Sequence, residues 1–71
     1  MATSDRIFLA LANPGRRELL KILTGQQLSA GQLSERFDLS RPAVAEHLKV
    51  LREAGLVADV PQGRRRIYRL T

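Results

Sequence analysis

"LSRPAVAEHLKVLREAGL", residues 39–56, predicts a helix whose two sides have different tasks. Ser40 suits the N-cap of a helix over 41–54, and Gly55 suits its stop. At about 100° per residue, one side is apolar and the opposite side is small, polar or charged. The apolar stripe consists of Val44, Leu48, Leu51 and Ala54, and the opposite side of Pro42, Ala45, Glu46, Lys49 and Glu53. The stripe is expected to anchor the helix to a core, leaving the other side for solvent or a partner.

Length and composition bound the class of protein. With 71 residues, of which 44 % are hydrophobic, the chain is expected to form one globular domain over residues 1–71, near the lower size limit. The absence of cysteine excludes disulfides and thiolate metal sites. A core this small gains buried area by oligomerisation. Without a signal-peptide pattern or an apolar run of membrane-spanning length, we expect a cytoplasmic protein that does not associate with membranes.

The net charge of +5 is concentrated near the C-terminus. Residues 1–60 carry eight basic and seven acidic side chains, whereas residues 61–71 carry four arginines and no acid. A local positive field of this kind favours a polyanionic partner such as nucleic acid, although basic segments also occur as plain solvated surface.

Three further helices are expected before residue 41, over about 4–12, 14–24 and 30–37. Asn13 and Pro14 suit the N-cap and first position of the second helix, and Ser29 and Gln32 form a capping box for the third. The first helix is apolar nearly all round, so a second face must meet the core or another chain. The candidate dimer-interface residues on it are Ile7, Phe8, Leu9 and Leu11. The basic residues Arg16, Arg17 and Lys21 are expected outside, touching phosphate or only water.

After Gly55 the hydrophobic pattern changes from helical to alternating. Strands over about 56–60 and 64–70, joined at Pro61-Gln62-Gly63, predict a β-hairpin. The predicted fold is mainly α with a small hairpin (α+β), a winged helix-turn-helix of about four helices followed by a two-stranded wing.

A helix-turn-helix presents the N-terminal side chains of its second helix to base edges in the major groove. Arg41 is suited to donate to guanine, Glu46 to accept from cytosine, and the small Ala45 to permit close approach. The phosphate ligands expected on the helix and the hairpin are Lys49, Arg52, Arg64, Arg65 and Arg66. These features predict binding to double-stranded DNA.

Three segments, "LANPGRRELLKIL", "LSAGQLSERFDLSRPAVAEHLKVLREAGLV" and "GRRRIYRL", resemble in order and spacing the bacterial ArsR/SmtB-type (arsenic-repressor) winged-helix regulators. The resemblance implies a homodimeric transcriptional repressor that binds a pseudo-palindromic operator. It assigns the base contacts to the start of the recognition helix and the wing contacts to 62–66. The base-contacting positions are Ser40, Arg41, Pro42, Ala45 and Glu46, and the wing begins at Gln62.

The chain departs from the family pattern where metals are bound. Metal-sensing members carry cysteine at the positions of Ser29 and Gly31, and others use a C-terminal helix that would follow Thr71. We therefore expect no metal and no other cofactor. Serine is common in the family at the position of Ala45, so a hydroxyl contact to DNA is expected to be missing.

The remaining polar residues suggest no catalysis. The lone His47 is expected at the core edge, its ring nitrogen bonded to a local partner, rather than as a metal ligand or pH switch. Tyr68 is expected to pack on the core. The chain has no cysteine, no G-x-S-x-G and no phosphate-binding glycine loop, so an enzyme is not expected. The alternative function is a winged-helix protein-interaction module without specific DNA binding.

Overall fold

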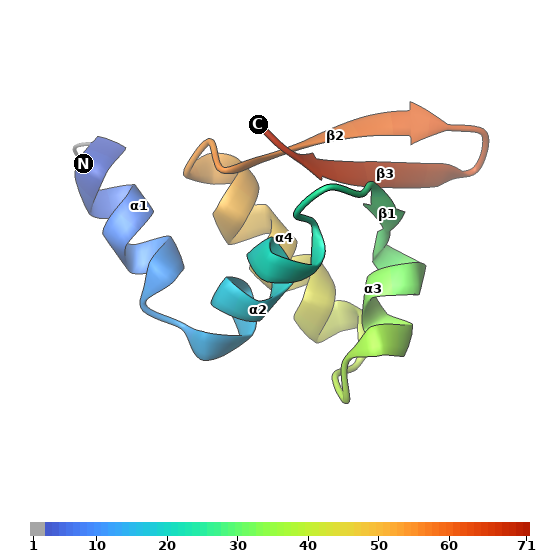
Figure 1. Ribbon diagram of the computed structural model, residues 1–71, viewed down its shortest axis with the longest axis horizontal. Coiled ribbons are helices and arrows are strands. Elements are labelled where there is room, and N and C mark those ends of the chain that lie inside the picture. The colour runs from blue at the N-terminus through green and yellow to red at the C-terminus, as the bar shows by residue number, and fades with distance from the viewer. Residues whose placement is uncertain (1–2) are drawn as a thin grey trace.

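The computed structural model describes residues 3–71; residues 1 and 2 of the predicted domain lie outside this range. Four helices precede a β-hairpin that extends along one side of the molecule, as Figure 1 shows. In chain order the elements are α1 (Thr3–Leu11), α2 (Pro14–Ile22), β1 (Leu28–Ser29), α3 (Ala30–Arg36), α4 (Arg41–Glu53), β2 (Val57–Gln62) and β3 (Arg65–Leu70). This arrangement confirms the predicted winged helix-turn-helix. No helix within residues 3–71 is long and apolar enough to cross a membrane.

The apolar stripe of α4 is the centre of the core. Val44, Leu48 and Leu51 are at most 1 % exposed, and Ala54 is also buried. Around this stripe α4 contacts α1, α2, α3 and β2. The other buried apolar residues come from these elements and from the segments beside them: Ala10, Leu19, Leu23, Leu28, Leu33 and Val57. Each buried leucine contributes about 1.5–3 kcal/mol relative to an exposed one, so the stripe fixes which side of α4 faces outward.

The hairpin is confirmed, and a third strand that was not predicted joins it. The sheet has the order β1-β3-β2 with antiparallel pairing. Only the two residues of β1 pair with β3, Leu28 opposite Tyr68 and Ser29 opposite Ile67. Such a short strand lacks the alternating run from which a strand is predicted. It ties the start of α3 to the wing.

The predicted three-residue loop of the hairpin is wrong. Gln62 pairs with Arg65, which leaves a two-residue turn of Gly63 and Arg64. Gly63, the first turn residue, has a φ of 63°, and Arg64, the second, has a negative φ, because no non-glycine residue within 3–71 has a positive one. These are the φ signs of a type II′ turn. Pro61 therefore belongs to β2, where an edge strand tolerates its missing N–H.

The other predicted ends differ from the structure by one or two residues. The first helix begins at Thr3 and ends at Leu11, one residue earlier than predicted at each end. The second ends at Ile22 rather than 24, because the chain turns there and Gly25 has a φ of 76°. Phe37 is extended and Ala54 is a C-cap, so α3 and α4 each end one residue sooner than predicted.

The predicted N-caps of α2, α3 and α4 are confirmed. Asn13 Oδ1 accepts from the Arg16 amide at 3.1 Å. At α3 both bonds of the capping box form, the Ser29 amide to Gln32 Oε1 at 2.9 Å and the Gln32 amide to Ser29 Oγ at 3.1 Å. Ser40 Oγ accepts from the Ala43 amide at 3.3 Å. These caps satisfy amides that a helix start leaves free, and so set where each helix begins.

Two arginines expected at a phosphate or in water instead hold the α1–α2 corner together. Arg16 donates from Nε to the Ala10 carbonyl at 2.8 Å and from Nη2 to the Leu9 carbonyl at 2.9 Å. Arg17 donates from Nη1 to the Leu11 carbonyl at 2.7 Å. A cation is favourable at the negative end of a helix, where carbonyls lack partners. Both side chains therefore stabilise the contact between α1 and α2.

We expect Arg16→Ala to lower the free energy of unfolding by about 1–2 kcal/mol, because it removes charge-assisted bonds to two terminal carbonyls of α1. Lys21→Ala is the matched control, since Lys21 makes only an exposed 3.9 Å ion pair with Glu18 and should cost less than about 0.5 kcal/mol. Urea unfolding of both variants measures the difference. Equal losses would show that the corner bonds add no stability.

Candidate nucleic-acid interface

The side of α4 opposite the apolar stripe is open to solvent. All five residues predicted to contact bases are exposed there, at the start of the helix: Ser40, Arg41, Pro42, Ala45 and Glu46. We call this set the recognition edge. Lys49 and Arg52 are exposed further along the same helix. Within this edge, Pro42 and Ala45 have short side chains, which leave room for another molecule to approach the helix backbone closely.

A hollow of about 400 Å³ lies between the start of α3 and the wing. Four of its lining side chains are arginines: Arg41, Arg64, Arg65 and Arg66. Ser29, Ala30, Gly31, Gln32, Glu35 and Tyr68 complete the lining. Glu35 is the one acidic residue among these ten, so the hollow carries a clear excess of positive charge. We call it the basic hollow, and its charge suits an anion such as phosphate.

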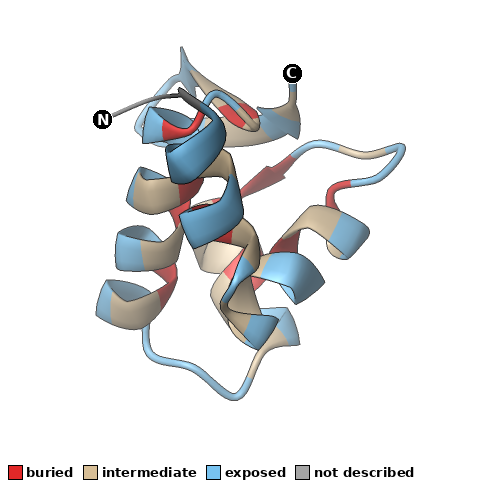
Figure 2. Cartoon of the chain, turned by 90° about the vertical axis from the view of Figure 1, so that its left-hand side faces the viewer, coloured by how far each residue is buried: buried red, intermediate tan, exposed pale blue. Residues whose placement is uncertain are grey.

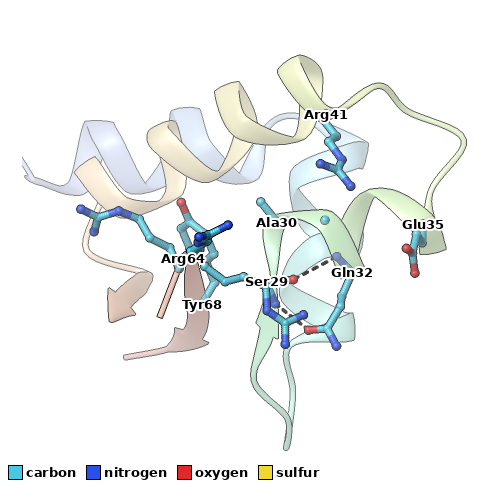
Figure 3. A pocket seen from close by; sticks show the side chains of 10 residues that line it. Ser29, Ala30, Gln32, Glu35, Arg41, Arg64 and Tyr68 are labelled. Carbon is cyan, nitrogen blue, oxygen red and sulfur yellow. Dashed lines mark hydrogen bonds between the residues drawn. The ribbon is translucent and has the colours of Figure 1, made fainter. Parts of the chain in front are cut away.

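Arg41 belongs to both the recognition edge and the basic hollow. Figure 3 shows its side chain pointing from α4 toward the beginning of α3. Its Nη2 lies 3.4 Å from the position that a Cβ on Gly31 would take, so the guanidinium lies against the bare glycine. In this position Arg41 is directed toward the hollow that the wing arginines also line. The structure thus joins the first turn of α4 and the wing into one continuous basic surface.

Two of the predicted phosphate ligands are already engaged within the chain. Asp59 Oδ2 on β2 lies 2.6 Å from Arg66 Nη1 on β3 and 3.6 Å from Arg52 Nη1 on α4. The Asp59 side chain is only 10 % exposed, whereas those of Arg66 and Arg52 are 59 % and 48 % exposed. We call these three residues the Asp59 cluster. Sequence reasoning missed it, although Asp59 stands two residues after the buried Val57 and so shares its side of β2.

The position of His47 corrects one prediction. Its Nδ1 is buried and finds no hydrogen-bond partner among residues 3–71. Its Nε2 faces α2, 3.3 Å from where a Cβ on Gly15 would lie. The ring thus fills the α2–α4 contact, where glycine allows the close approach.

The other polar positions behave as structural residues. Tyr68 packs against the core, as predicted. Ser29 is buried and its hydroxyl is used in the α3 cap, while Gly31 underlies Arg41. No group of three or more potential metal-ligating His, Cys, Asp or Glu side chains occurs within residues 3–71.

The first helix packs with one side only. Ala10 is fully buried and Ile7 and Leu11 are half-buried, but Phe8 is 71 % and Leu9 56 % exposed. Figure 2, which faces this side of the molecule, shows much of α1 in the colour of exposed residues. A single chain therefore leaves two large apolar side chains of α1 uncovered, next to each other in sequence.

Comparison with protein families decides where this fold belongs. Residues 13–59 match the family described as "Bacterial regulatory protein, arsR family". The chain belongs to the arsR family. This confirms the resemblance seen in the three sequence segments, and the matched range includes the whole recognition edge.

Curated and solved arsR-type relatives agree with this assignment. The chain is 47% identical over 66 residues to HTH-type transcriptional regulator Rv2034 of Mycobacterium tuberculosis, covering 93% of this chain and 62% of that protein. It is 33% identical to transcriptional repressor SdpR of Bacillus subtilis, covering 93% and 73%. The solved homodimeric winged helix-turn-helix DNA-binding domain of Mb0332 from Mycobacterium bovis superposes with a TM-score of 0.91 at 25% identity, covering 96% and 63%. The chain thus spans about two thirds of the length of these relatives.

For this arsR-family chain we expect His47→Leu to raise the free energy of unfolding by about 1 kcal/mol, because it removes a buried ring nitrogen without a partner. His47→Asn is the contrasting variant, since it keeps a polar atom near Nδ1 and loses ring volume, and it should destabilise. Thermal unfolding measures both. A less stable leucine variant would mean that Nδ1 has a partner in solution.

Proposed function

We propose that this arsR-family chain is the DNA-binding part of a homodimeric transcriptional repressor, which acts in the cytoplasm on a pseudo-palindromic operator. The observation that carries the proposal is that the recognition edge of α4 and the wing arginines meet at the basic hollow, with Arg41 common to both. A duplex with its major groove on α4 would bring a phosphate strand alongside this hollow. The repressor name of the relative in Bacillus subtilis supports the direction of regulation.

The proposed base contacts come from the middle of the recognition edge. Glu46 is exposed and suited to accept from the exocyclic amine of cytosine, while Pro42 and Ala45 allow apolar contact and close approach. The Ser40 hydroxyl accepts the Ala43 amide and keeps its own proton free to donate. Since Arg41 turns to the hollow, it is better placed for a phosphate than for guanine.

The proposed phosphate ligands are Lys49 on α4 and the exposed residues at the tip of the wing, Gln62, Arg64 and Arg65. Gln62 and Arg65 face each other across the last pair of the hairpin, and Arg64 lies in the two-residue turn. The two-residue turn places these side chains at the far end of the wing. Most of the affinity for arbitrary duplex is expected from these contacts, and it should weaken steeply with salt.

The proposed homodimer interface is the outer side of α1, with Ile7, Phe8, Leu9 and Leu11. Large exposed apolar residues commonly mark an interface. The homodimeric state named for the Mycobacterium bovis domain supports a second copy as the partner. No cysteine stands at the positions of Ser29 and Gly31, so we propose that a thiolate-bound metal does not control DNA binding.

A second candidate function is a protein-interaction module, favoured by the exposure of Phe8 and Leu9. Selection of bound duplexes from a random pool, followed by titration at two salt concentrations, separates the two functions. Enrichment of a two-fold symmetric sequence supports the operator-binding repressor. No binding to any duplex at micromolar protein and low salt supports the interaction module. Placing the selected sequence in a promoter then tests repression.

Substitutions in the wing and in the recognition edge should affect DNA binding in different ways. The double variant Arg64→Gln with Arg65→Gln should weaken binding to selected and random duplexes alike. The slope of log affinity against log salt concentration should become shallower by about 0.9 for each lost phosphate contact. Glu46→Ala should leave that slope nearly unchanged and relax the preference at one base pair, worth about 1–3 kcal/mol. Fluorescence anisotropy across a salt series measures both. An unchanged slope in the double variant would contradict the role of the wing.

Leu9→Asp should convert dimers to monomers, because it places a charge in the proposed α1 interface. Leu9 is 56 % exposed within one chain, so the monomer fold should survive. Affinity for the selected operator should fall by about 100-fold or more once the two half-sites are bound independently. Sedimentation and anisotropy measure the two effects. Gln27→Asp adds the same charge at an exposed position outside α1 and should change neither.

A further inference from the structure

We propose that the Asp59 carboxylate competes with DNA phosphate for Arg52 and Arg66, and thereby lowers both the affinity of the protein for duplex DNA and the salt dependence of that affinity. This inference rests on the proposed DNA binding and adds to it a residue that sets the strength of the phosphate contacts. Asp59 lies outside the recognition edge and is suited to act through the two arginines that it holds.

The geometry concentrates two positive side chains on one carboxylate oxygen. Asp59 Oδ2 accepts from Arg66 Nη1 at 2.6 Å and lies 3.6 Å from Arg52 Nη1. The three side chains come from β2, β3 and α4, so the cluster also links the wing to the recognition helix. Because the carboxylate is 10 % exposed and the arginines about half exposed, the acid is shielded while its partners remain open to a second anion.

Both arginines lie where DNA is proposed to bind. Arg66 lines the basic hollow together with Arg41, Arg64 and Arg65. Those three make no ion pair within residues 3–71, and Glu35 of the same hollow lies beyond ion-pair distance of them. Arg52 is exposed on α4, the recognition helix. The arginines near the duplex thus fall into a paired and an unpaired group.

Pairing with Asp59 changes what these arginines contribute to binding. Two guanidinium groups and one carboxylate leave the cluster a net charge of +1, so an approaching phosphate gains less than from two free cations. Affinity for arbitrary duplex grows with the number of phosphates that are neutralised. Base contacts by the recognition edge do not depend on that number. A masked pair of arginines therefore lowers the affinity for selected and random duplexes alike, and it flattens the salt dependence of both.

The test is Asp59→Asn, which keeps the size of the side chain and removes its charge. We measure its affinity for a random 20-base-pair duplex and for a duplex selected from a random pool, between 50 and 200 mM salt. Each released arginine should steepen the slope of log affinity against log salt concentration by about 0.9. Over this salt range, that change corresponds to a roughly three- to fourfold larger loss of affinity. Affinity for both duplexes should rise at low salt, and the ratio of selected to random affinity should stay nearly unchanged.

The matched control is Glu18→Gln. It also raises the net charge by one and also breaks an ion pair, that with Lys21, but on α2 outside the recognition edge and the wing. Its salt slope should stay close to that of the unaltered protein. Adding Arg66→Gln to Asp59→Asn should reverse most of the gain in random-duplex affinity. In the otherwise unaltered protein, Arg66→Gln should flatten the slope less than Arg64→Gln does.

The outcomes separate the claims. An unchanged slope in Asp59→Asn, or an equal loss of affinity for both duplexes, would overturn the masking role. If thermal unfolding shows that Asp59→Asn does not fold, the comparison of Arg66→Gln with Arg64→Gln decides, and equal flattening overturns the proposal. If the unaltered protein binds neither duplex at low salt, the proposed function itself is overturned and this inference with it.

Discussion

The burial of one side of α4 is the constraint on which the rest of the structure depends. Val44, Leu48 and Leu51 lose nearly all contact with water, so rotation of the helix about its axis would cost several kilocalories per mole. With that side fixed to the core, Pro42, Ala45 and Glu46 have only solvent to face. The core thus determines the presentation of the recognition edge, and the Ser40 cap determines where that edge starts.

The net charge of +5 is divided among tasks that composition does not reveal. Arg16 and Arg17 close the end of α1, and Arg52 and Arg66 share Asp59. The arginines of the basic hollow that make no ion pair within residues 3–71 are Arg41, Arg64 and Arg65. Counting basic residues therefore overestimates the number of free cations, because some arginines are already bonded to carbonyls or to a carboxylate.

Local signals predicted most of the fold because they act over a few residues. Asn13, Ser29 and Ser40 cap the helices that they were predicted to cap, since a cap bond spans only about three residues. Contacts between distant segments escaped prediction. The pairing of Leu28 with Tyr68 and the bonds of Arg16 to α1 depend on where the chain returns in space.

The same limit applies to the candidate site. Exposure of the recognition edge followed from the period of α4, and its residues lie where expected. The direction of Arg41 did not follow, because it depends on how α3 packs beside the start of α4. A ring nitrogen of His47 was expected to have a local partner, and the structure shows that the buried Nδ1 has none within residues 3–71. Periodicity thus predicts which residues are outside, and tertiary packing decides what they touch.

The small core of one chain and the few base contacts of one recognition edge both favour pairing with a second copy. One recognition edge offers few base contacts, each worth about 1–3 kcal/mol, whereas specific binding must exceed non-specific binding by about 4–10 kcal/mol. A dimer that presents two recognition edges to one operator doubles the base contacts, while the entropy cost of associating protein and DNA arises only once. The apolar side chains that one core leaves uncovered, Phe8 and Leu9, lie on the helix where a second copy would supply that doubling. The surface of α1 that the fold leaves exposed is therefore the surface on which the proposed second copy would pack.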